Sequence, residues 1–587
     1  MIKVLAFLWL LGSLVPVASA DDSAVDKQFI QLYQQEWGFR LREFPQLAAN
    51  SGVDDYANQL KHVSIEDQLR RYRYWQNTLR QLDKIDCQQL SRENCINYRI
   101  FQRQLINFSN DYETRLYLFP FNSDWAWYID WAMLPEGRFN RTDDYRNYLA
   151  KLDKLPDVNR EYLQLLRLAL KEGMTQPQAI LKGRDQAISS HIVTEPTESV
   201  FYKPFNAKKP VFFADKEWHA LQQRAKILIN RNVVPAYTEL LEFMHKEYYP
   251  GARKELAATA LPGGEKLYRA QIYKYATVDM SPKEIHQLGL SEVKRIRTDM
   301  DAVIKATGFK GSFADFLQFL RTDEQFYAKS AHQLLAEASY FAKVIDGKLP
   351  EYFGKLPRQP YGIAPVPEAI APFFTTGRYV GGAFEDGKAG YYWVNTHNLK
   401  QRPMYTLPAL TLHEAAPGHH LQAALALELD EQPAFRRSDY ISAYGEGWAL
   451  YAEKLGVEMG IYETPYQEFG RLTYEMWRAC RLVIDTGIHA FGWSRQQAID
   501  YLAGNTALAL HNVETEVDRY ISWPGQALSY KLGEYTIWQL RTKAEETLAA
   551  KFSLRDFHDF ILGLGSVPLD VLIDEFDYWL QRQSPKP

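Results

Sequence analysis

The most informative stretch of the chain is His413-Glu414-Ala415-Ala416-Pro417-Gly418-His419-His420-Leu421-Gln422. It places three of the 13 histidines within eight residues, and a glutamate directly follows the first of them. Two imidazoles with an adjacent carboxylate are the parts that a zinc peptidase of the His-Glu-x-x-His kind uses. The spacing differs from that motif, because the position four residues after His413 is Pro417.

The spacing predicts an interrupted helix. His419 lies six residues after His413, a rise of about 9 Å in an ideal helix and a different face. An unbroken helix cannot bring both imidazoles to one ion at about 2.0 to 2.1 Å. Pro417 lacks an N–H and Gly418 permits unusual dihedral angles, so this dipeptide predicts a break. His419 is then the expected second ligand, with His420 as its close competitor or as a neighbour of the site.

Three glutamates complete the predicted metal site. Glu414 follows the first ligand, where a base can take a proton from water without binding the metal. Glu446 opens the motif Glu446-Gly447-Trp448-Ala449-Leu450-Tyr451-Ala452-Glu453, and the glycines on either side of it favour it as the third ligand. Glu453 is the alternative ligand, or the group that orients a ligand histidine from behind. We therefore expect one zinc ion bound by His413, His419 and Glu446.

Further candidates lie downstream. Arg478, Arg481, Asp485 and His489 share one face of a predicted helix. Such a stripe is usually a structural ion-pair network, which we favour for the arginines, although either could bind a substrate carboxylate. His489 and Tyr530 are candidates for stabilising an oxyanion, and a packed tyrosine is the alternative for Tyr530.

These motifs, together with Pro524-Gly525-Gln526-Ala527-Leu528-Ser529-Tyr530-Lys531-Leu532-Gly533, resemble the bacterial domain-of-unknown-function family 885. Members are similar to helical zinc peptidases that use two histidines and a downstream glutamate, the class containing angiotensin-converting enzyme and thermostable carboxypeptidases. The resemblance implies a mainly α, large two-lobed fold with a central cleft. A small β element, expected from the run of residues 389–396, would lie near the active site. Its edge could pair with a substrate backbone, and a structural hairpin is an equal alternative.

Composition and the N-terminus narrow the class further. A net charge of −4 without long runs of either sign argues against nucleic acid as a partner. Residues 1–20 have the charge, apolar core and small terminal residues of a signal peptide, with cleavage expected between Ala20 and Asp21. No later stretch is apolar enough to span a membrane. We expect a soluble, secreted or periplasmic protein with a disulfide between Cys87 and Cys95 and a buried, inert Cys480.

The remaining chain reads as mostly helical. We expect an N-terminal helical lobe over residues 21–260 and a C-terminal catalytic lobe over residues 261–587 that carries both metal motifs. A capping box at Ser281-Pro282-Lys283-Glu284 predicts a helix toward Thr307. Further helices are expected over 405–416, 442–457, 467–491, 495–503, 526–549 and 568–580.

Three functions are compatible with these residues. The first is an exported zinc-dependent peptidase that cleaves short peptides in a helical cleft. The second is a metal-free helical binding protein that kept the cleft and lost the chemistry. Pro417 motivates this alternative, because it stands where the His-Glu-x-x-His motif has its second histidine. The third is a metal-dependent hydrolase of non-peptide amides or esters. A serine hydrolase is disfavoured because no Gly-x-Ser-x-Gly motif occurs. The oligomeric state stays open.

Overall fold

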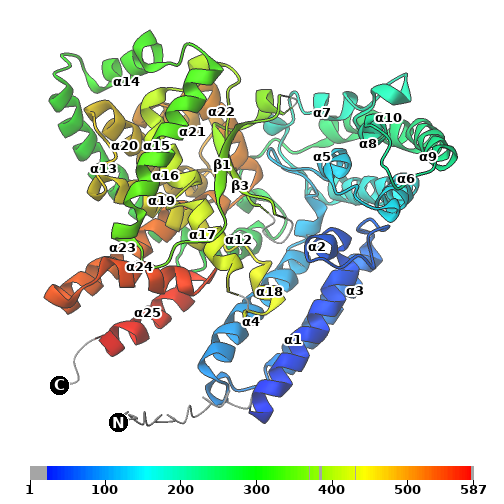
Figure 1. Ribbon diagram of the computed structural model, residues 1–587, viewed down its shortest axis with the longest axis horizontal. Helices are drawn as coiled ribbons and strands as arrows, with labels where there is room; N and C mark the ends of the chain where they lie inside the picture. Colours follow the sequence, from blue (N-terminus) through cyan, green and yellow to red (C-terminus); the bar gives the residue numbers. More distant parts are fainter. Residues whose placement is uncertain (1–22, 369, 383–386, 430, 584–587) are drawn as a thin grey trace, which may run out of the picture.

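The computed structural model describes residues 23–368, 370–382, 387–429 and 431–583. The predicted signal peptide and its cleavage site lie outside the described residues. The chain is mainly helical, as predicted, and the small β element expected in it is a three-stranded sheet in the described residues (Figure 1). Among the described residues, no helix combines the length and apolar character needed to cross a membrane.

The N-terminal helices gather on one side of the molecule, coloured blue to teal in Figure 1. A disulfide joins Cys87, which precedes α4, to Cys95 near the start of that helix, as predicted. The helices of this part are α1 (Ala24–Glu43), α2 (Pro45–Asn50), α3 (Ile65–Leu82), α4 (Arg92–Glu113), α5 (Trp127–Ala132), α6 (Thr142–Glu172), α7 (Gln186–Ser189), α8 (Lys203–Asn206), α9 (Asp215–Leu228), α10 (Val234–Phe243) and α11 (Tyr249–Gly251).

The later helices occupy the other side, coloured green to red (Figure 1). The predicted capping box is present at the start of α13. The helices are α12 (Gly264–Ala276), α13 (Pro282–Thr307), α14 (Phe313–Thr322), α15 (Ala331–Tyr352), α16 (Leu407–Glu414), α17 (His419–Leu427), α18 (Ala434–Arg437), α19 (Ser442–Glu458), α20 (Pro465–Phe491), α21 (Arg495–Asn505), α22 (Leu510–Ser522), α23 (Ser529–Leu548), α24 (Leu554–Gly563) and α25 (Leu569–Gln583).

Helix α20 forms the centre of this later part. Every residue from Phe469 through His489 is buried, so the helix is covered on all sides. It packs along α13, where a side chain at Gly289 would collide with Leu482 and Val483. Cys480 lies buried in the middle of α20, where burial raises the pKa of its thiol and keeps it protonated and inert.

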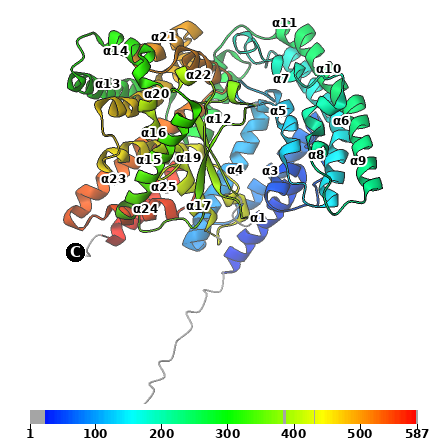
Figure 2. The same cartoon turned by 45° about the horizontal axis from the view of Figure 1, so that its top comes forward.

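The sheet lies beside α15 and α17 in Figures 1 and 2. Its strands are β1 (Tyr361–Pro365), β2 (Gly377–Val380) and β3 (Gly390–Val394), in the order β1-β3-β2. β3 is the strand expected near residues 389–396, but it pairs parallel to β1 and antiparallel to β2. Both edges of β3 are therefore covered, and the expectation that this strand offers an open edge was wrong. The edges belong to β1 and β2.

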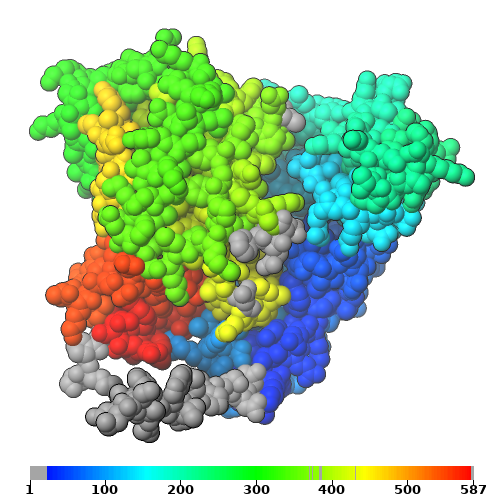
Figure 3. Space-filling view, viewed as in Figure 1, coloured from blue at the N-terminus to red at the C-terminus, as the bar shows by residue number. Residues whose placement is uncertain are grey.

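The hydrophobic core does not divide at the predicted lobe boundary. Tyr162 and Leu472, from opposite sides of residue 260, belong to one buried cluster. Phe101 and Trp448 likewise share the second cluster. On the face shown in Figure 3, blue and cyan N-terminal residues directly border green and yellow segments. The assignment of two lobes at residue 260 stays a prediction.

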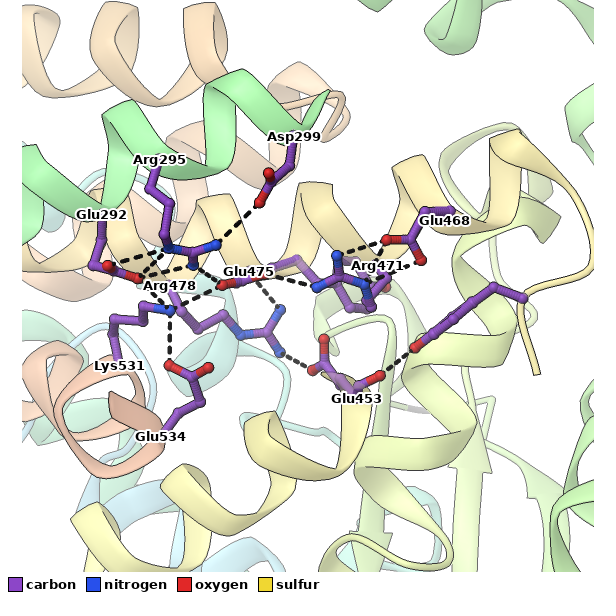
Figure 4. Close-up of polar contacts among 12 residues, drawn as sticks. Glu292, Arg295, Asp299, Glu453, Glu468, Arg471, Glu475, Arg478, Lys531 and Glu534 are labelled. Atoms are coloured by element: carbon purple, nitrogen blue, oxygen red, sulfur yellow. Dashed lines mark hydrogen bonds and ion pairs between the residues drawn. The ribbon is translucent and has the colours of Figure 1, made fainter. Parts of the chain in front are cut away.

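A buried network of charges joins α13, α20 and α23 (Figure 4). Lys531 is 1% exposed, and its Nζ lies 3.1 Å from Glu475, 3.0 Å from Glu292 and 2.7 Å from Glu534. Burial opposes its charge, but the three carboxylates prevail and raise its pKa above the ordinary value. Lys531 therefore stays fully protonated, although it is buried between three helices.

We predict that Lys531→Ala lowers the free energy of unfolding by about 3 to 5 kcal/mol, because it leaves buried carboxylates without their counter-charge. Lys543→Ala is the matched control, since Lys543 lies on the same helix and pairs with Asp577 at the surface. The control should cost less than about 1 kcal/mol. Urea unfolding of both variants checks this, and equal losses would contradict it.

Candidate metal centre

The helix that carries His413 is interrupted before His419, as predicted. α16 ends at Glu414, and α17 begins at His419. Gly418 has an ordinary negative φ of −73°, so a left-handed conformation is not what requires glycine here. A Cβ at this position would lie 2.0 Å from the carbonyl oxygen of His413, so the chain can turn this tightly only without a side chain.

The interruption is fixed from both ends. The N–H of His420 donates to the carbonyl of Ala415 over 3.0 Å, and the indole Nε1 of Trp448 donates to the carbonyl of Pro417 over 2.8 Å. Trp448 is fully buried two residues after Glu446, on α19. One hydrogen bond thus joins the turn between the two histidines to the helix that carries the candidate third ligand.

The three predicted ligands lie together. Nε2 of His413 and Nε2 of His419 lie 3.5 Å and 3.4 Å from Oε2 of Glu446. The two imidazole rings are 4.8 Å apart and perpendicular. Ligand atoms at about 2.05 Å from a tetrahedral zinc ion are separated by about 3.3 Å. The spacing of these atoms therefore fits a zinc ion with a fourth position left for another ligand.

Glu453 lies behind His413. Its Oε1 is 2.7 Å from Nδ1 of His413, so it can orient the ring and leave Nε2 facing Glu446. Burial alone would lower the pKa of His413, but Glu446 and Glu453 raise it to about 10. Conversely, burial alone would raise the pKa of Glu446, but the two histidines lower it well below its ordinary value. Glu453 lies outside the group of three ligand atoms, in the place expected for an orienting residue.

Glu414 lies in the same cavity as the three ligands but outside their group. Its Oε2 accepts a hydrogen bond of 2.7 Å from the backbone N–H of Tyr379 on β2. This contact fixes one carboxylate oxygen against the edge of the sheet. The other oxygen is the one that can face a water or substrate in the cavity.

Close contact of two glycines joins the helices that carry Glu446 and Tyr530. α19 and α23 pack so tightly that a Cβ at Gly447 would lie 2.5 Å from the Cα of Gly533, and one at Gly533 would lie 1.9 Å from a carbonyl oxygen of α19. Gly447 directly follows Glu446, and Gly533 lies three residues after Tyr530. The two helices thus bring a candidate ligand and a candidate oxyanion donor to one wall.

These residues line a cavity of about 810 Å³. A volume of this size suits a short peptide or a drug-sized molecule. Of the predicted site residues, seven line it, and His420, Glu453 and His489 do not. The lining members are His413, Glu414, His419, Glu446, Arg478, Arg481 and Tyr530.

His489 is not brought to the site, which corrects the role expected for it. Its Nδ1 accepts from the N–H of Ala258 at 3.0 Å, and its Nε2 lies 2.9 Å from the carbonyl of Tyr520. Both ring nitrogens are thus used by backbone, and burial lowers the pKa of this neutral ring to about 4. His489 shares a face with Arg478 but lies 11 residues on, about 16 Å along the helix.

His420 also points elsewhere. Its ring packs on Tyr361 and Tyr379, and its Nδ1 lies 3.3 Å from the hydroxyl of Tyr379. Burial lowers the pKa of His420 to about 4, so it is a neutral ring packed beneath the sheet. The structure thus places His419, and not His420, beside Glu446.

Three residues at the site escaped the sequence analysis. Tyr440 lines the cavity, and its ring packs on the glycine before Glu446. Burial and the neighbouring Glu446 raise the pKa of Tyr440 well above its ordinary value. Tyr379 holds Glu414, and Arg519 donates to the hydroxyl of Tyr530 over 3.3 Å. Of these three residues, only Tyr440 could have been suspected from the sequence, because it lies close to a candidate ligand, six residues before Glu446.

A second group of potential ligands lies at the surface, formed by His62, Asp67 and Glu161. Asp67 caps α3 in a capping box with Ser64, and Glu161 accepts from the N–H of Val63 and contacts His62. Both carboxylates are thus already used in hydrogen bonds that stabilise the fold, and the group lies at the surface. The prediction of one zinc ion per chain therefore rests on the buried group alone.

We predict about one zinc ion per purified chain, measured by elemental analysis. His419→Ala should remove most of the zinc, because it deletes one of three ligands. His420→Ala is the matched control and should retain it, since its ring packs under β2. Greater loss in the His420 variant would contradict the assignment of the second ligand.

A pH dependence of stability is expected from Asp485. Burial raises the pKa of Asp485 to about 7 from an ordinary 3.8, although Tyr268 and the N–H of Gly525 donate to it. The folded chain therefore binds a proton that the unfolded chain has released, and this contribution to stability is lost as the pH rises from about 4 through about 7. Asp485→Asn should flatten that part of the profile, measured by urea midpoints at several pH values. An unchanged slope would contradict this origin.

Comparison with known proteins places the fold. A model of the family described as "Bacterial protein of unknown function (DUF885)" matches residues 45–575. The crystal structure of a predicted lipoprotein from Colwellia psychrerythraea superposes with a TM-score of 0.89 at 27% identity, covering 96% of this chain and all of that chain. A predicted lipoprotein of unknown function from Shewanella oneidensis gives 0.70 at 19% identity, covering 95% of this chain and all of that one. No curated protein matches. The chain belongs to the DUF885 family.

Proposed function

We propose that this protein is an exported zinc-dependent hydrolase that cleaves short peptides, with Glu414 as general base. The observation that carries the proposal is the spacing of His413, His419 and Glu446. Nε2 of each histidine lies 3.4 to 3.5 Å from Oε2 of Glu446. Two histidines and one glutamate with a free fourth position are typical of catalytic zinc sites rather than structural ones. Glu414 adds a base in the same cavity.

The bound metal would polarise a carbonyl group and make water a better nucleophile near neutral pH. Glu414 would take a proton from the attacking water and pass it to the departing amine, as a carboxylate held in place by the N–H of Tyr379 at one oxygen. Glu453 would keep His413 in the orientation that binds.

Two tyrosines are placed to hydrogen-bond the oxygen that becomes negative. Tyr530 and Tyr440 both line the cavity beside Glu446. Because the pKa of Tyr440 is raised well above its ordinary value, its hydroxyl stays protonated and can donate at neutral pH. Tyr530 already accepts a hydrogen bond from Arg519, which leaves its own proton available for donation.

The outer edge of β2, whose residues line the cavity, favours a peptide over other amides. The N–H of Asn395 donates to the carbonyl of Thr376, so alternate residues of β2 face β3. The backbone N–H and C=O groups of Gly377 and Tyr379 therefore point away from β3, in agreement with the hydrogen bond from the N–H of Tyr379 to Glu414. A substrate backbone lying beside β2 could pair with Gly377 as an added strand and pass the base.

The exported location is part of the proposal. It is supported by the composition of residues 1–20 and by the disulfide between Cys87 and Cys95, a bond that persists in oxidising compartments. The two similar solved structures are those of predicted lipoproteins. A periplasmic or secreted hydrolase of peptides is compatible with all three observations.

The proposal is tested with zinc-loaded protein and a library of short peptides, with cleavage followed by mass spectrometry. Glu414→Gln should lower the rate by about 10² to 10⁴-fold, the usual contribution of a positioned base, while zinc stays bound. Glu514→Gln, an exposed position on α22, is the matched control and should keep full activity.

Each outcome separates the alternatives. Full activity in Glu414→Gln would remove its role as base. A chain that binds no zinc after loading would favour the metal-free binding protein. A chain that binds zinc and cleaves esters or non-peptide amides, but no peptide, would favour the broader hydrolase.

A further inference from the structure

The walls of the cavity carry an excess of positive charge. Setting aside Glu414 and Glu446, which belong to the metal centre, three carboxylates line it, those of Asp124, Asp439 and Glu516. Six arginines line the same cavity, namely Arg378, Arg436, Arg437, Arg478, Arg481 and Arg519. The chain as a whole has a net charge of −4, so this local excess is opposite in sign to that of the protein. A concave wall of one sign concentrates ligands of the other.

Two of these arginines share one carboxylate. Nη2 of Arg481 lies 2.8 Å from Oε2 of Glu516, and Nη1 of Arg519 lies 3.7 Å from Oε1. Arg481 also donates to the hydroxyl of Tyr520, and its guanidinium stacks over the ring of Tyr530 at 4.2 Å. One carboxylate is thus shared by two guanidinium groups directly beside the candidate oxyanion donor.

Hydrogen-bonding capacity is also left over at this wall. Buried arginines normally use their N–H groups, yet Nη1 of Arg481 and Nε of Arg478 have no partner among the residues that the structure describes, although the two residues are only 2% and 4% exposed. Arg519 is the reachable member, because 17% of its side chain is exposed and its Nη1 makes only the long contact to Glu516. An acceptor in the cavity would satisfy this group.

We infer that this wall, formed by Arg519 with Arg481 behind it, binds a carboxylate of the ligand. The ligands preferred by the cavity are then peptides with a free carboxylate, such as a C-terminus, near the bond that faces Glu414. That these peptides are substrates rests on the proposed function, whereas the binding of a carboxylate does not. Planar guanidinium groups match a carboxylate with two parallel hydrogen bonds, and the neighbouring tyrosine ring excludes water from the contact.

The test compares acids with amides. A pool of acetylated tripeptides is prepared both as free acids and as C-terminal amides, and binding is measured by equilibrium dialysis with mass spectrometry. Zinc-loaded Glu414→Gln protein is used, so that no peptide is consumed. We expect the bound acids to be favoured over their amides by about tenfold or more, as for one charge-assisted hydrogen bond.

Variants locate the preference. Arg519→Gln should bring the ratio of acid to amide close to one while binding of the amides persists, and Arg519→Lys should retain part of the preference. Arg378→Gln, an exposed position on β2 on which no ion pair depends among the described contacts, gives a second variant if the first folds poorly, and it should weaken the acids alone. Arg160→Gln on the surface of α6 is the control and should change nothing.

Several results would overturn the inference. They are binding of neither series, equal binding of acids and amides, or a preference that survives in both Arg519→Gln and Arg378→Gln, in which case the metal itself takes the carboxylate. Selective binding of acids by a chain that hydrolyses no peptide would keep this inference and remove the proposed function. Hydrolysis of acids and amides at equal rates would do the reverse.

Discussion

Two imidazoles can bind one ion only when their nitrogens come within a few ångströms of a common point, and here five residues separate them. The turn that solves this is so tight that Gly418 lies against the carbonyl of His413, and Trp448 holds it through Pro417. The position of Glu446 opposite both rings follows from the same hydrogen bond. Without that turn, the chain would present two histidines on different faces of one helix.

A second requirement is that α20 and its neighbours stay in place around the centre. Lys531 ties α13, α20 and α23 together, and Figure 4 shows Arg478 reaching Glu453 from the same helix bundle. Nη2 of Arg478 lies 3.6 Å from the oxygen of Glu453 that contacts His413. Arg478, which lines the cavity, and the candidate ligand His413 therefore share one carboxylate, so charge bound near Arg478 would act on the candidate ligand set through Glu453.

Local sequence was enough for the features that depend on neighbours along the chain. The break at Gly418, the helix starting at Pro282 and the disulfide at Cys87 each follow from residues close together. The contact of Tyr379 with Glu414 could not be foreseen, since it joins a strand edge to a helix end. His489 was misjudged for a related reason: a shared helix face says which way a side chain points, and not what covers it three turns away.

The contact between Gly447 and Gly533 has a consequence for protein engineering. Because no side chain separates α19 from α23, the gap between Glu446 and Tyr530 is set by two backbones in contact and cannot be widened or narrowed by exchanging side chains there. A designer who wished to admit a bulkier ligand would have to work on other parts of the lining, such as β2. The rigid half of the pocket would stay unchanged while the other half was remodelled.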